Sequence, residues 1–126
     1  MQLNSKTDKY QWTNHSLMKM RYYGLSQQRV KRVIKSPERI EEGIVEKTIA
    51  SMQTAGSEKH PYEIWVMYQT PKLKATPKVE DKKTKLFSLL NSDKKLKIIS
   101  AWRYPGKSPK NNPIPEEILQ EIRNII

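Results

Sequence analysis

The sequence predicts an α+β domain with an N-terminal helical hairpin, an antiparallel sheet of three to four strands and a C-terminal helix. Three observations predict it. Residues 14–36 carry helix caps and helical spacing, residues 39–104 change to extended runs separated by turn residues, and residues 115–126 return to helical spacing. At 126 residues the chain can bury one core and is too short for two, so we expect a single domain over 1–126.

The helical hairpin has clear boundaries. Residues 1–10 are polar, and we expect them to be frayed or to form a short edge strand. Asn14 suits the N-cap of the first helix, and Gly24 follows its end. Ser26 suits the N-cap of the second helix, which must end before Pro37 because the residue preceding a proline avoids helical geometry.

The second helix is amphipathic when its residues are placed on a wheel at about 100° per residue. One side is apolar and consists of Val30, Val33 and Ile34. The other side is cationic and consists of Arg29, Lys31, Arg32 and Lys35. Because the apolar side must pack against the protein, we expect the cationic side to face outward as a fixed surface.

Extended segments follow the hairpin. Ile44–Gln53 alternates loosely, and Tyr62–Gln69 is apolar on both faces at its centre, which is typical of an interior strand. Leu96–Tyr104 predicts another strand, and Lys85–Asn91 fits a strand or a helical turn, with a strand favoured. Pro115–Ile126 predicts a helix, with proline at its first position, two glutamates in its first turn and an isoleucine-rich stripe.

The composition is strongly basic, with a net charge of +11 and a sequence pI near 9.9. Pro71–Lys85 holds six lysines in fifteen residues and almost no apolar residue, so we expect a mobile loop or an insertion there. This segment contributes +4, so the basic character of the rest of the chain does not depend on it. An ordinary lysine-rich, solubilising surface is the alternative explanation of the charge.

Several classes of chemistry find no support in the sequence. Cysteine is absent, which excludes disulfides, thiol catalysis and zinc–thiolate sites. The two histidines are 45 positions apart, so we expect no metal and no cofactor. There is no glycine-rich phosphate loop, Ser-His-Asp set or pair of catalytic carboxylates. No apolar run is long enough for a signal peptide or membrane span, so we expect a cytoplasmic protein with no membrane partner.

The densest charge lies in Thr13–Arg39, where residues 17–39 carry a net charge of +6. Its cations are Lys19, Arg21, Arg29, Lys31, Arg32, Lys35 and Arg39. A dense cationic face on helices is the usual mark of a polyanion partner, and nucleic acid is the commonest one. We therefore expect the first six of these residues to bind nucleic acid, whether RNA, DNA or a ribosome.

Two further residues are candidates for the same interface. Trp65 shares a strand face with Glu63, Met67 and Gln69, and it could stack an unpaired base, an interaction worth roughly 1–3 kcal/mol. Core packing is the more common role for such a tryptophan. Lys47 lies on the neighbouring strand and could add one phosphate contact.

Metal-independent RNA cleavage needs a base for the 2′-hydroxyl proton, cations for the phosphate and an acid for the leaving oxygen. His15, Lys19 and Tyr22 share one stripe of the first helix. The positive helix N-terminus favours a neutral His15, which suits a base. Arg103 is the candidate for phosphate stabilisation, and Glu63 is an alternative base. The structural alternatives are a surface role for His15 and Arg103 and core packing for Tyr22.

Two strings resemble a small family of unknown function related to BrnT toxins, and through them to the RelE/ParE superfamily. They are HSLMKMRYYGLSQQRVKRVIKSPERIEEG and KIISAWRYPG. The resemblance covers residues 12–70 and 94–106. It implies a compact antiparallel sheet flanked by helices, a ribonuclease activity in some relatives, and Arg103 with Tyr104 at the end of the closing strand. These two residues are adjacent, so in a regular strand they point to opposite faces unless Pro105 forces a bulge.

Three hypotheses about function follow. The first is an RNA-binding, toxin-like protein that cleaves RNA without a metal, with His15, Arg103 and Tyr104 at its centre. The second is a non-catalytic module that binds nucleic acid or the ribosome through the same basic face. The third is a domain whose cationic surface is covered by an acidic, antitoxin-like protein.

Overall fold

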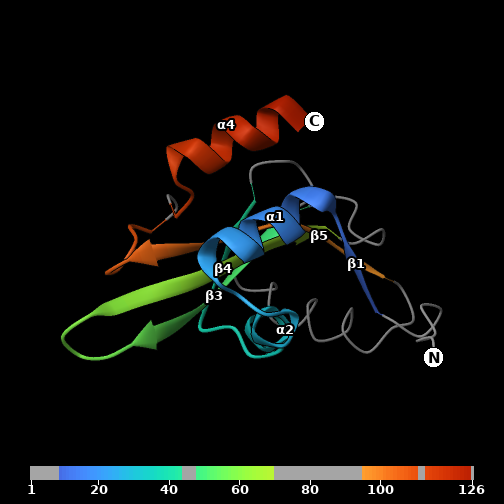
Figure 1. Cartoon of the computed structure of the whole chain (residues 1–126). Coiled ribbons are helices and arrows are strands. Elements are labelled where there is room, and N and C mark those ends of the chain that lie inside the picture. Colours follow the sequence, from blue (N-terminus) through green and yellow to red (C-terminus); the bar gives the residue numbers. More distant parts are fainter. Residues whose placement is uncertain (1–8, 44–47, 70–94, 111–112, 126) are drawn as a thin grey trace.

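The computed structural model describes residues 9–43, 48–69, 95–110 and 113–125. Within them, the chain forms one five-stranded sheet and three helices (Figure 1). The α+β class predicted from the sequence is therefore confirmed. The segments at 71–85 and 85–91, and Lys47, lie outside the described residues.

The sheet has the order β1-β5-β4-β3-β2. Its strands are β1 (Tyr10–Trp12), β2 (Arg39–Glu42), β3 (Thr48–Gly56), β4 (Pro61–Gln69) and β5 (Leu96–Pro105). The strand β1 runs parallel to β5, and the other pairs are antiparallel. The expected three to four antiparallel strands were thus too few. The two edge strands have only three and four residues, which is too short to show a clear alternation in the sequence.

The helices are α1 (Asn14–Tyr23), α2 (Gln27–Lys35) and α4 (Glu116–Ile125). Ser26 caps α2 by accepting a hydrogen bond from the Arg29 amide at 3.0 Å, and Gly24 ends α1 at φ 70°, as predicted. The N-cap of α1 is Thr13, one residue before the predicted Asn14. The Thr13 hydroxyl also donates to the Ile98 carbonyl at 2.7 Å, so the cap anchors the helix to β5.

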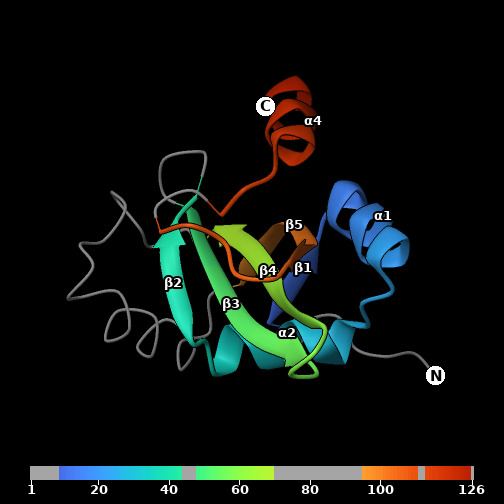
Figure 2. The same ribbon diagram turned by 90° about the vertical axis from the view of Figure 1, so that its left-hand side faces the viewer.

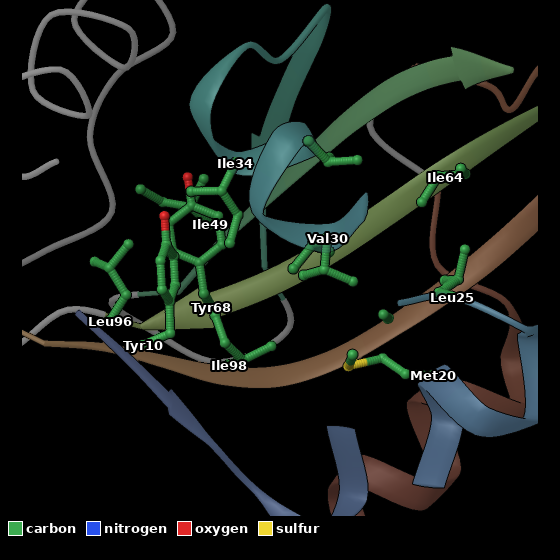
Figure 3. Close-up of a cluster of buried hydrophobic side chains, with 13 residues drawn as sticks. Tyr10, Met20, Leu25, Val30, Ile34, Ile49, Ile64, Tyr68, Leu96 and Ile98 are labelled. Atoms are coloured by element: carbon green, nitrogen blue, oxygen red, sulfur yellow. The ribbon is translucent and has the colours of Figure 1, made fainter. Parts of the chain in front are cut away.

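Apolar side chains form a cluster on each face of the sheet. On one face, α2 packs Val30, Val33 and Ile34 against the sheet, and all three are fully buried. Figure 3 shows Val30 and Ile34 lying over Tyr68 and Ile98. Because this burial removes the whole apolar side of α2 from water, it also determines which way the cations of that helix point.

The second cluster lies under α4 and includes Trp65, Trp102, Ile118 and Ile122. The two tryptophans stack with ring centroids 6.1 Å apart and an angle of 7° between their planes. Figure 2 shows α2 and α4 on opposite sides of the sheet, with α1 beside β1 and β5. None of the helices in the described part of the chain is long and apolar enough to span a membrane.

Candidate nucleic-acid interface

The outward side of α2 carries the cations that the helical wheel placed there. Arg32 and Lys35 are exposed, and Arg29 and Lys31 are half-buried. Lys31 Nζ lies 5.1 Å from the centre of the Tyr10 ring, and Tyr10 belongs to the core cluster under α2. The result is a cationic surface attached to the core rather than a flexible chain of lysines.

Gln53 of β3 fixes the position of Arg29. Its side-chain oxygen accepts a hydrogen bond from Arg29 Nη1 at 2.6 Å. Its amide nitrogen donates to the carbonyl oxygens of Arg32 and Ser36, at 3.2 and 2.8 Å. One neutral side chain therefore holds a guanidinium and satisfies the end of α2, where carbonyl groups lack helical partners. Nothing in the sequence singles out Gln53, because its partners are 17 to 24 positions away and belong to another element.

Arg103 lies on the same side of the sheet as α2. It pairs in register with Ile64, a member of the core cluster under α2. Its guanidinium stacks on the Tyr62 ring at 4.8 Å. It also lies near the end of α1, because Nη2 is 3.8 Å from the position that a Cβ would take on Gly24. Tyr62 was not singled out from the sequence, since only the pairing of β4 with β5 brings it to Arg103.

His15 lies on the other side of β5. Its Nε2 shares a hydrogen bond with the hydroxyl of Ser100 at 3.1 Å and is 3.8 Å from Glu121 of α4. Burial lowers the pKa of His15; the carboxylate of Glu121 raises it, and the charge of Lys19 lowers it, with a net decrease. The imidazole is therefore neutral at pH 7, but its side chain is only 7% exposed.

The structure does not bring His15, Arg103 and Tyr104 together. Ser100, the partner of His15, and Tyr104 lie on the face of β5 that is under α4. Arg103 lies on the opposite face, because successive residues of a strand alternate. The bulge between β4 and β5 falls at Met67/Tyr68, far from Pro105, so it does not turn Tyr104 toward Arg103. These three residues therefore do not form one centre in the structure.

Two residues expected to bind nucleic acid are instead buried. Trp65 is 0% exposed and has Trp102 and the Arg39 guanidinium against its ring, so no face remains for a base. Lys19 is 4% exposed, and its Nζ lies 3.1 Å from Glu121. Both expectations are corrected for the same reason: α4 and the second core cluster cover this side of the sheet. Arg21 is exposed at the end of α1, as is Tyr22.

Glu63, the alternative base, is a buried carboxylate in a network of hydrogen bonds. It is 1% exposed, and its Oε1 accepts hydrogen bonds from Trp65 Nε1 at 2.9 Å and from the Ser108 hydroxyl at 2.6 Å. Arg39 Nη1 lies 3.5 Å from its Oε2. Arg39 also donates to Ser108 and Pro109 and pairs with Glu41, so this arginine belongs to the same closed network. Neither residue is free to meet a substrate.

The described residues contain no group of three or more histidines or acids that could hold a metal ion. The fold and the position of α2 together define the class of protein: an α+β domain with a cationic helix packed on one face of a mixed sheet. No protein-family model matches the sequence, and no curated protein or solved structure shows a significant match to it.

Proposed function

We propose that this chain is a non-catalytic RNA-binding module of the cytoplasm that uses the cationic side of α2. The observation that carries the proposal is the fixed orientation of that helix. Val30, Val33 and Ile34 are fully buried, so the cations on the opposite side point to solvent in one arrangement. A set of cations held in place loses less conformational entropy on binding phosphates than a flexible tail does.

The distribution of charge supports RNA or another nucleic acid as the partner. The chain carries a net charge of +11, and such a balance attracts polyanions over long range. The resemblance to BrnT and RelE/ParE proteins points in the same direction. Binding without cleavage is the version that we propose, because the candidate base His15 and the candidate cation Arg103 lie on opposite faces of the sheet.

The test measures RNA affinity by fluorescence anisotropy over a series of salt concentrations. We expect Arg29→Ala/Arg32→Ala to weaken binding for all sequences and to reduce the slope of log K against log salt by about one to two units. The control Lys59→Ala/Lys110→Ala removes the same charge from exposed positions away from α2. An unchanged slope in the arginine variant, or an equal loss in the control, would remove α2 from the interface.

The same RNA, incubated with the protein in EDTA, tests the absence of cleavage. We expect it to stay intact over hours. Fragments ending in a 2′,3′-cyclic phosphate that disappear in the variant His15→Ala would instead establish a metal-independent ribonuclease.

A protein partner is the other possible occupant of this face. A salt-insensitive complex with an acidic protein, formed at the expense of RNA binding, would favour that partner.

A further inference from the structure

Three of the six arginines of this lysine-rich chain lie on the side of the sheet that α2 covers. They are Arg29 and Arg32 of α2 and Arg103 of β5. Burial lowers the pKa of Arg29, and the positive charges of Arg32 and Arg103 lower it further, against the opposing effect of Tyr62 and Glu38. The register agrees with this effect: Gln53, which binds Arg29, pairs with Ile64 of β4, and Ile64 pairs with Arg103 of β5, so these residues follow one another across three strands on the α2 side of the sheet.

Carboxylates do little to relieve this repulsion. Among the described residues, Glu38 is the carboxylate that raises the pKa of Arg29, and its two oxygens accept hydrogen bonds from the amide and hydroxyl of Thr54, at 3.1 and 2.9 Å. Arg103 takes part in none of the ion pairs found among the described residues. Its Nε is buried and has no hydrogen-bond partner. A guanidinium stays charged and carries five donors, so Arg103 keeps unused donor capacity.

Neutral groups contact two of the three guanidiniums, those of Arg103 and Arg29. Tyr62 stacks on Arg103 at 4.8 Å, and Gln53 binds Arg29 at 2.6 Å. The Tyr62 ring lies against Gly56, where an added Cβ would come within 2.9 Å of it. The protein therefore positions like charges beside one another without neutralising them. This is the arrangement expected of a preformed anion site.

We propose that Arg103, Arg29 and Arg32 form a discrete phosphate-binding site that takes one phosphate group of an RNA strand. The site deepens the proposed function and rests on it, since α2 supplies two of the three arginines. Guanidinium groups suit phosphate because their planar forks donate two parallel hydrogen bonds, which an ammonium group does not. The chain uses lysine for most of its charge, 18 residues against six arginines, yet places arginines here.

A simpler role for Arg103 is to sit at the C-terminal end of α1, where unpaired carbonyl groups attract a cation. That role predicts a loss of stability without a specific loss of RNA affinity. The experiment therefore measures thermal stability and RNA affinity together. The variants are Arg103→Gln, Arg103→Lys and the control Lys97→Gln, which removes the same charge from an exposed position of the same strand.

We expect Arg103→Gln to weaken RNA binding about tenfold, with a salt slope smaller by about one unit. Lys97→Gln should change affinity by no more than about twofold. Arg103→Lys keeps the charge, so it should retain the slope but lose several-fold in affinity, because the fork geometry is gone. Equal effects of Arg103→Gln and Lys97→Gln, or a stability loss with unchanged affinity, would overturn the proposal.

A second measurement on the wild-type chain keeps the test independent of variant folding and of RNA. Inorganic phosphate is titrated while the arginine Nε–H signals are followed by NMR, with sodium chloride at equal ionic strength as control. We expect the Arg103 signal to shift with phosphate and not with chloride. A phosphate-specific shift without RNA binding would leave the site standing and reject the proposed function. If RNA binding depends on Arg29 and Arg32 but phosphate does not shift the Arg103 signal, the proposed function stands and the phosphate site is rejected.

Discussion

Lys19 of α1 and Glu121 of α4, which are 102 positions apart in the chain, form an ion pair that joins the two helices. The Nζ lies 3.1 Å from Oε1 and 3.3 Å from Oε2 of the carboxylate. It also lies 5.0 and 5.4 Å from the ring centres of Tyr22 and Tyr23. The pair therefore connects α4 to the rest of the domain beside its apolar contacts at Ile118 and Ile122.

Replacing this lysine should weaken the attachment of α4. Lys19 is 4% exposed while the Glu121 side chain is 37% exposed, so Lys19→Met leaves a carboxylate that water can still reach. We expect a loss of about 1–2 kcal/mol in the free energy of unfolding, less than for a fully buried pair. Urea denaturation measures it, and a cycle with Glu121→Gln should give a coupling near 1 kcal/mol. Arg123→Met, an exposed control on α4, should stay within about 0.5 kcal/mol; an equal effect would contradict the pair.

Glu63→Gln should destabilise the domain strongly. The carboxylate accepts hydrogen bonds from Trp65 and Ser108, and Arg39 lies beside it. A glutamine cannot neutralise Arg39 and offers one acceptor oxygen instead of two, so we expect a loss of about 3 kcal/mol. Tryptophan fluorescence during urea denaturation measures it directly, because Trp65 is one of the partners. Glu42→Gln at an exposed position of β2 serves as control, and a loss below about 1 kcal/mol for Glu63→Gln would rule out this network as an anchor.

Two glycines with the same backbone conformation separate the cost of a positive φ from the cost of a clash. Gly56 has φ +83°, and a Cβ there would meet the carbonyl of His60 and the Tyr62 ring. Gly106 has φ +73°, and a Cβ there would meet nothing within 4 Å. Gly106→Ala should therefore cost about 1 kcal/mol, and Gly56→Ala at least about 1 kcal/mol more. Equal losses in thermal denaturation would show that the turn at Gly56 relaxes.

The stability of the domain should depend on pH through His15. Because its pKa in the folded protein is lowered from the ordinary value near 6.5, the unfolded chain binds a proton more readily. The stabilisation is therefore fully present above about pH 6.5 and is lost as the pH falls toward the lowered pKa. Urea midpoints from pH 8 to pH 5 measure it. His15→Gln should flatten this part of the curve, whereas the control His60→Gln should keep it. If the urea midpoint of His15→Gln depends on pH as it does in the wild type, other titrating groups cause that dependence.

Much of the local structure could be predicted from the sequence. The cap at Ser26, the left-handed Gly24 and the amphipathic spacing of Val30, Val33 and Ile34 all depend on residues within one or two turns of each other. The central strands could also be predicted locally, because each of them contains a long apolar run. The edge strands were harder to predict: a short strand was only one of two alternatives for residues 1–10, because β1 pairs with β5 some 86 positions away, and β2 has only four residues.

The sequence by itself therefore determined the α+β class, the boundaries of α2 and the outward direction of its cations, because these follow from short-range backbone and burial preferences. Only the tertiary structure decided which charges meet. The register that places Arg103 opposite Ile64 puts it against Tyr62 on the α2 side of the sheet, and His15 lies on the other side. A shift of one residue in that pairing would exchange the two faces. Such a register is set by the packing of both core clusters at once, which no single segment of the chain contains.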